Sequence, residues 1–208
     1  MSRGNVMKKY LVAALFSSTA LFAQADGFSG FYVGAEVDFN KQSFSIPVKE
    51  LGYSYYDGNY TGSSSRSVGV GVVGGYMFDY GNNFVGVVEG KISLPNNKVK
   101  DELGNEIAKE NLRLGVHYLQ GYQIDRFLPY VKIGAEYGNF DMNDSNPAFN
   151  RVTFENSGAV GFSYGAGVKA KITDNFVAGF DYSRVTLEGK NSIEFKSNTI
   201  GVNFSYLF

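Results

Sequence analysis

The sequence predicts an all-β protein: an eight-stranded antiparallel up-and-down transmembrane β-barrel. Three observations predict it. The N-terminus has the pattern of a secretory signal peptide, eight later segments alternate apolar with polar residues, and the connections between them alternate between short turns and long polar loops. After the N-terminus, the sequence has no unbroken apolar run of the ~20 residues that a membrane-spanning helix needs. Alternating strands need no such run, because inward and outward residues cancel in the hydropathy average.

The first 25 residues have the three parts of a signal peptide. Lys8 and Lys9 supply positive charge, residues 10–22 are apolar apart from a Ser-Ser-Thr interruption, and Ala23-Gln24-Ala25 matches an A-x-A cleavage site. A transmembrane helix is the alternative, but the apolar stretch is too short for it. We therefore expect a signal peptide over 1–25 and one outer-membrane barrel domain over 26–208.

Eight segments show the two-residue period of a strand with two unlike faces. The first begins with Phe31, Val33 and Ala35 on one face and Tyr32, Gly34 and Glu36 on the other. The other seven repeat this alternation in turn, with glycine, charged or small polar residues between the apolar positions. In chain order, the predicted strands span residues 31–40, 68–80, 84–94, 112–122, 130–138, 162–172, 176–183 and 199–208.

The connections alternate in length. Three short turns, 79–83, 123–127 and 173–175, are rich in residues that tolerate turn dihedrals. Four longer, polar loops are predicted over residues 45–66, 95–108, 141–156 and 187–193. Every proline lies in a long loop or, as Pro129, at the start of a strand, where the missing N–H is tolerated. Outer-membrane barrels have this asymmetry, which places both ends of the mature chain at the periplasmic rim.

The composition of the polar face indicates that it lines the interior. It carries charges of both signs, and these can pair inside a narrow lumen where an unpaired charge would be costly. It also carries many of the 26 glycines, which leave room for long side chains in a barrel of eight strands. We predict a lumen charge network of Glu36, Asp38, Glu89, Lys91, Arg113, Lys132, Glu136, Lys169, Lys171 and Asp181.

The apolar face carries aromatic residues near the strand ends, as expected for the girdle of a membrane barrel. A soluble lipocalin-like barrel or β-sandwich, with the apolar face inside, is the alternative fold. The predicted girdle comprises Phe31, Phe39, Phe78, Tyr80, Tyr118, Tyr122, Tyr137, Phe176 and Tyr182.

The chain ends with alternating aromatics, Phe204, Tyr206 and Phe208. This ending resembles the β-signal of bacterial outer-membrane proteins, which implies recognition by the barrel assembly machinery. Residues 30–35, 128–135 and 161–169 resemble the OmpA-like/opacity-type outer-membrane β-barrel superfamily. The resemblance implies a location in the bacterial outer membrane after export, and it specifies the fold better than any activity.

Composition argues against several classes of site. A net charge of −1 gives no reason to expect a nucleic-acid partner, and the absence of cysteine excludes disulfides and thiolate metal sites. The single histidine, His117, lies on the polar face, where we expect Lys91 and Lys132 as neighbours rather than an orienting carboxylate. Asp141, Asp144 and Glu155 share a loop without a calcium cage motif. We therefore predict no catalytic, cofactor-binding or metal-binding residues.

The predicted function is a barrel with a plugged polar lumen and a structural or adhesin-like surface role. Residues 51–60, in the first long loop, are dense in Tyr, Ser, Gly and Asn, a composition suited to adaptable contacts. A narrow, low-conductance porin is the alternative, and an outer-membrane enzyme is less favoured. The expected partners are outer-membrane lipid, the assembly machinery through the C-terminal strand, and a host or surface ligand through the long loops.

Overall fold

The computed structural model describes residues 27–47, 58–64, 66–100, 106–142, 157–188 and 194–208. Within these ranges the chain forms antiparallel strands of 4 to 18 residues. None of the described residues belongs to a helix long and apolar enough to span a membrane. The strands are β1 (Gly30–Pro47), β2 (Asn59–Ser64), β3 (Ser67–Asp79), β4 (Phe84–Leu94), β5 (Asn97–Lys100), β6 (Glu106–Tyr122), β7 (Phe127–Met142), β8 (Ser157–Lys171), β9 (Phe176–Glu188) and β10 (Glu194–Leu207).

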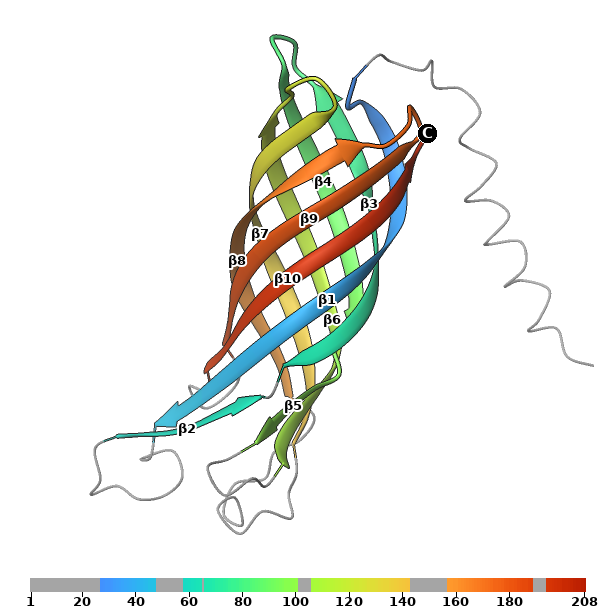
Figure 1. The fold of residues 1–208 in the computed structure, drawn as a ribbon. Coiled ribbons are helices and arrows are strands. Elements are labelled where there is room, and N and C mark those ends of the chain that lie inside the picture. Colours follow the sequence, from blue (N-terminus) through green and yellow to red (C-terminus); the bar gives the residue numbers. More distant parts are fainter. Residues whose placement is uncertain (1–26, 48–57, 65, 101–105, 143–156, 189–193) are drawn as a thin grey trace, which may run out of the picture.

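Eight of these strands close into a barrel (Figure 1). Each pairs with its sequence neighbour in the order β1, β3, β4, β6, β7, β8, β9 and β10, and β10 returns to pair with β1. The closing register places Ala35 opposite Phe204 and Val37 opposite Val202. A closed sheet leaves no unpaired edge, as a lipid environment requires. The eight-stranded up-and-down barrel predicted from the sequence is confirmed.

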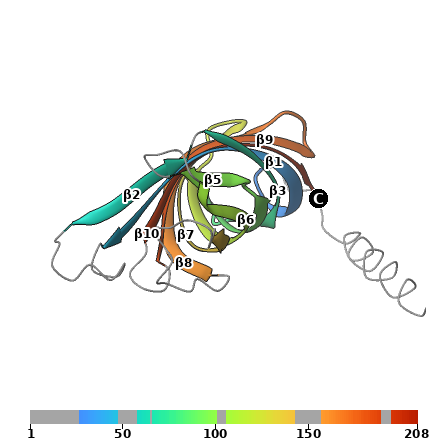
Figure 2. The ribbon, with the colours of Figure 1, turned by 90° about the horizontal axis from the view of Figure 1, so that it is seen from below.

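The remaining two strands extend the sheet beyond one end of the barrel. β2 pairs with the last residues of β1, and β5 links β2 to β6 (Figure 2). The structure thus differs from the predicted loops over 45–66 and 95–108, which contain these strands and the ends of β1 and β6. Their polar side chains lack the apolar alternation of the spanning segments, so the sequence does not reveal them. The signal peptide and residues 143–156 and 189–193 lie outside the described residues.

The opposite end is closed by tight turns. Between β3 and β4, Gly81, Asn82 and Asn83 all have positive φ, and the Asp79 carboxylate accepts a 2.7 Å hydrogen bond from the Gly81 amide. The C-terminus lies at this end, where the Phe208 amide donates to the Phe31 carbonyl at 2.8 Å. The structure therefore has a turn end, which carries the C-terminus, and a loop end, which carries β2 and β5 (Figure 1).

The barrel has its apolar face outside and its charges inside. Phe31, Val70 and Phe204 are 45%, 56% and 53% exposed, whereas Glu36 and Lys132 are each only 4% exposed. A soluble barrel or sandwich would show the reverse, so the arrangement is that of a membrane barrel. The predicted aromatic girdle also lies on the outer surface. Its exposed members include Phe39, Tyr80, Tyr118, Tyr122, Tyr137, Phe176 and Tyr182.

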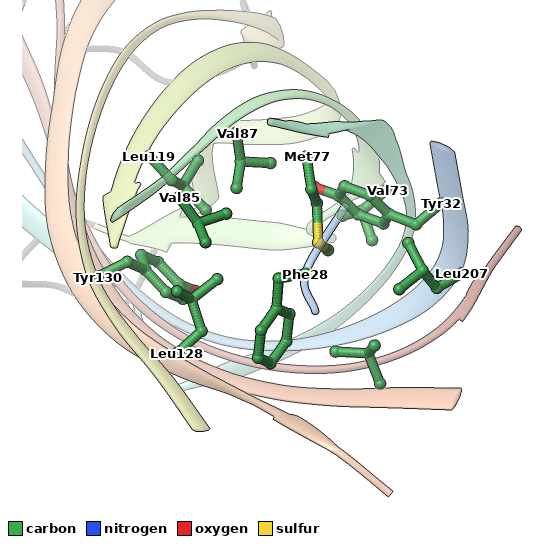
Figure 3. Close-up of a cluster of buried hydrophobic side chains, with 11 residues drawn as sticks. Phe28, Tyr32, Val73, Met77, Val85, Val87, Leu119, Leu128, Tyr130 and Leu207 are labelled. Carbon is green, nitrogen blue, oxygen red and sulfur yellow. The ribbon is translucent and has the colours of Figure 1, made fainter. Parts of the chain in front are cut away.

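An apolar plug fills the turn end of the lumen (Figure 3). Phe28, which precedes β1, lies among inward-facing side chains of the wall and is fully buried. The polar lumen expected from the sequence is therefore found in the middle of the barrel and not at this end. The plug consists of Phe28, Tyr32, Val73, Met77, Val85, Val87, Leu119, Leu128, Tyr130, Val177 and Leu207.

Candidate functional site

The predicted lumen charges form three clusters between the plug and the loop end. The first is centred on Lys169 of β8, which is 1% exposed. Its Nζ lies 3.1 Å from Glu89 Oε2 and 4.8 Å from the centre of the Tyr32 ring. The Tyr32 hydroxyl donates to the same Glu89 oxygen at 2.5 Å. The cluster therefore contacts the plug through Tyr32, and its lysine and glutamate charges neutralise each other across the lumen.

The second cluster contains two cations and three acids. Lys132 of β7 pairs with Asp181 of β9. Lys91 of β4 pairs with Glu36 of β1 and also with Asp38, at 2.9 Å to its Oδ1. Glu36 and Asp38 both point into the lumen because a strand places residues two positions apart on the same face. Each pair joins two strands separated by one other strand, β3 between β1 and β4 and β8 between β7 and β9, so the ion pairs link next-nearest strands across the inner wall.

The third cluster is centred on Arg113 of β6. Its guanidinium donates to both oxygens of Glu110, at 2.7 and 2.8 Å, and lies 3.7 Å from Glu136. Glu136 Oε1 is 3.0 Å from His117 Nε2. The imidazole has room because glycines flank it: a Cβ at Gly134 would lie 2.4 Å from His117 Cδ2. This close approach shows why the lumen wall needs glycine beside its larger groups.

Two of these contacts were missed by the sequence reasoning. Alternation counted back from Leu112 puts Glu110 on the lipid side, but a β-bulge between Glu110 and Leu112 turns it inward, where it is fully buried. The sequence reasoning also expected no orienting carboxylate beside His117, and this expectation is wrong. The residue that contacts its ring is the carboxylate of Glu136, because the β6–β7 register sets His117 against Gly134.

Lys171 is the one predicted network member placed apart from these clusters. It lies at the turn end of β8, with its Nζ 5.6 Å from the centre of the Phe28 ring. There it covers the plug rather than joining the ion pairs at the centre. The structure thus brings nine of the ten predicted residues into the mid-lumen clusters and places the tenth at the turn end.

A second obstruction lies at the loop end. The rings of Phe140 and Phe195 stack at 4.2 Å between centroids, and both side chains are at most 1% exposed. Asn97, the first residue of β5, donates to Glu110 Oε2 at 2.8 Å, as Gln42 does at 3.2 Å. β5 therefore ties the loop-end extension to the charges beneath it. Buried side chains are therefore packed at both ends of the lumen, and buried ion pairs lie between them.

The three residues of the predicted assembly signal lie on the outer face of the closing strand or just after it. Phe204 and Tyr206 are 53% and 39% exposed. Phe176 of β9 stacks on Phe204 at 5.3 Å, and Phe208 meets Tyr206 edge-on at 4.9 Å. These rings form a continuous aromatic surface at the turn end of the β9–β10 seam.

The chemistry that the lumen can support is limited by its packing. His117 is 2% exposed and its Nε2 faces a carboxylate, so it is screened from solvent within the charge clusters. Among the described residues, the structure shows no group of three or more His, Asp or Glu side chains arranged to hold a metal ion. The buried ion pairs and hydrogen bonds of the lumen are therefore suited to holding the strands of the wall together.

The sequence over residues 11–208 matches the family model of the outer membrane protein beta-barrel domain. The chain belongs to this family. Membership in the outer membrane protein beta-barrel family places the protein in the bacterial outer membrane and confirms the predicted superfamily resemblance. Among curated proteins, none matches the sequence significantly.

Solved outer-membrane barrels share the fold of this family member at low sequence identity. Neisserial surface protein A superposes with a TM-score of 0.56 at 16% identity, covering 86% of this chain and 98% of that one. AlkL, determined in lipid bilayers, gives 0.53 at 16% identity, covering 90% and 94%. OprG from Pseudomonas aeruginosa gives 0.51 at 14% identity, covering 90% and 99%. At these identities the similarity establishes the fold alone.

Proposed function

We propose that this protein is a sealed outer-membrane barrel whose role is structural or lies in surface interaction, not in transport or catalysis. The observation that carries the proposal is the filled lumen, with the Phe28 plug at the turn end and the Phe140–Phe195 stack at the loop end. A narrow, low-conductance porin needs a continuous aqueous path. An enzyme needs a reacting group that a substrate can reach, and His117 is buried.

A sealed lumen is expected to conduct no ions and to exclude a charged thiol reagent. We expect the protein to give no discrete conductance steps in planar bilayers. Since the chain has no cysteine, single-cysteine variants report access cleanly. Met77→Cys, inside the plug, is expected to stay unlabelled by a charged thiol reagent applied from either side, whereas Asp125→Cys, in an exposed turn, is labelled. Stable conductance steps together with a labelled Met77→Cys would instead support the porin.

The surface role is proposed for the loop end, which we place outside the cell. β2 and β5 lift residues such as Thr61 and Lys100 beyond the barrel mouth, where they are exposed. The tyrosine-rich stretch over 51–60, of which 51–57 lie outside the described residues, leads into β2. The support is the composition of this stretch and its connection to an ordered extension of the sheet.

Surface interaction predicts that tyrosines of this loop contribute to binding. We expect replacement of Tyr53, Tyr55 and Tyr56 by serine to reduce attachment of bacteria displaying the protein to epithelial cells or extracellular matrix. Serine keeps the loop length and removes the aromatic contact area. Tyr80→Ser with Tyr122→Ser, at the turn end, is the matched control. Attachment that is equal in the two variants and the parent would end the proposed role for this loop.

We also propose that residues 1–25 direct export and that Phe204, Tyr206 and Phe208 are read by the barrel assembly machinery. The support is the exposure of the Phe204 and Tyr206 rings on the closing strand, with Phe208 packed edge-on against Tyr206. Phe208→Ala should lower the amount of heat-modifiable barrel in cells while leaving refolding of the purified chain into detergent intact. Equal loss in both settings would assign the residue to stability alone.

A further inference from the structure

A row of outward-facing cations lies at the loop end of the wall formed by β3, β1, β10 and β9. Lys41 of β1 is opposite Asn198 of β10, and Asn198 is opposite Arg184 of β9. Arg66 directly precedes β3, whose first residue pairs with Asn40. The three cations are exposed, and β9, β10 and β1 lie side by side in the view of Figure 1.

An apolar row lies directly beneath these cations on the same strands. Phe39 is opposite Ile200, and Ile200 is opposite Tyr182, with exposed fractions of 48%, 41% and 48%. Two residues along a strand separate the rows, which is roughly 7 Å. The Tyr182 hydroxyl joins them by donating to Asn198 Oδ1 at 2.8 Å. The charged row thus begins where the lipid-facing surface ends.

A hollow of about 390 Å³ spans both rows. Lys41, Arg66 and Asn198 line its polar side, and Phe39, Tyr182 and Ile200 line its apolar side. In the described part of the chain, neither Lys41 nor Arg66 forms an ion pair with an acidic side chain. The hollow therefore presents uncompensated positive charge next to an apolar floor, the complement of an anionic lipid.

We propose that this surface binds the phosphorylated headgroup of an outer-leaflet lipid, with Lys41 and Arg66 contacting phosphate and Arg184 extending the charged row. Charge-assisted hydrogen bonds from arginine and lysine to phosphate are strong, and basic pockets beside the hydrocarbon boundary bind headgroups. The cations lie on the outer wall and not at a loop tip, so a soluble polyanion would have to lie against Phe39 and Tyr182 to reach them. The proposal rests on the orientation proposed above, with the loop end outside.

The test compares purified, detergent-solubilised proteins by native mass spectrometry in the presence of diphosphoryl or monophosphoryl lipid A. The wild-type protein is expected to retain the diphosphoryl form in preference. Lys41→Gln with Arg66→Gln is expected to weaken that retention about tenfold, which corresponds to about 1.4 kcal/mol. Lys100→Gln with Arg126→Gln removes the same charge from β5 and the turn end, and is expected to leave retention unchanged.

Several outcomes would overturn the proposal. The first is equal retention of the two lipids by the wild-type protein, and the second is equal weakening of retention in the control variant. The third is a Lys41→Gln, Arg66→Gln variant that keeps its lipid retention but no longer binds heparin, which would indicate that the site binds a soluble polyanion. Heat-modifiable migration on gels establishes whether each variant is folded. If a double variant is not folded, Arg184→Gln is tested in its place. The readout does not depend on conductance, so failure here and failure of the sealed-barrel proposal can be told apart.

Discussion

Replacing Lys169 with methionine is expected to lower the free energy of unfolding by about 3–5 kcal/mol, the range measured when one partner of a buried ion pair is removed. Methionine nearly matches the length of lysine and fills its place beside Tyr32, so a cavity contributes little. The loss comes from Glu89, which is 5% exposed and loses the cation at 3.1 Å from its carboxylate. A buried carboxylate without its counter-charge retains most of its desolvation cost.

A double variant separates the charge from the packing. Glu89→Gln with Lys169→Met removes both charges but leaves an amide oxygen to accept the Tyr32 hydroxyl bond. We expect it to recover most of the loss, because replacing a whole buried pair is often neutral. Lys196→Met is the matched control: its pair with Glu194 is at the surface, with the lysine side chain 42% exposed, and its loss should cost about 0–1 kcal/mol.

The measurement is urea unfolding in lipid vesicles, followed by circular dichroism and by heat-modifiable migration, since the chain has no tryptophan to report fluorescence. If Lys169→Met and Lys196→Met were equally mild, the lumen would be hydrated enough to screen its charges, and the sealed-barrel proposal would weaken with it.

The spanning part of the fold could be predicted from sequence because lipid imposes a local rule. Each strand must present apolar side chains outward at every second position, so Val68, Val70 and Val72 reveal their face without any knowledge of the partner strand. Inside the barrel no such rule applies. Val73, Met77 and Leu119 occupy inward positions in strands whose other inward residues are mostly glycine or polar, and they assemble into a plug only because the strands bring them together.

Contacts between strands depend on register, which the sequence leaves open. The pairing of His117 with Glu136 follows from an alignment of β6 and β7 that sets His117 against Gly134. A bulge at Glu110 then breaks the alternation by which inward residues are counted. The extension formed by β2 and β5 was missed for a related reason: its strands carry polar residues on both faces, buried Asn97 and Ser64 among them, so no apolar alternation marks them in the sequence.

The second large prediction tests whether the outward, apolar face of the barrel wall contacts lipid. Val116→Arg is expected to lower the free energy of unfolding in vesicles by about 2–4 kcal/mol, the cost of arginine on the lipid face near the bilayer midplane. Val116 is 64% exposed and lies six residues before the end of β6 at Tyr122. With a strand tilt of about 40°, that places it roughly 15 Å from the turn end of an apolar band about 25 Å tall.

Two controls give the result its meaning. Val116→Leu keeps the site apolar, and Thr61→Arg adds the same charge to exposed β2 beyond the barrel mouth, so both should change the free energy of unfolding by less than about 0.5 kcal/mol. In a soluble barrel an exposed valine tolerates arginine as readily as Thr61 does. A large loss at Val116 alone therefore requires hydrocarbon around the wall, while equal effects at Val116 and Thr61 would mean that water surrounds both.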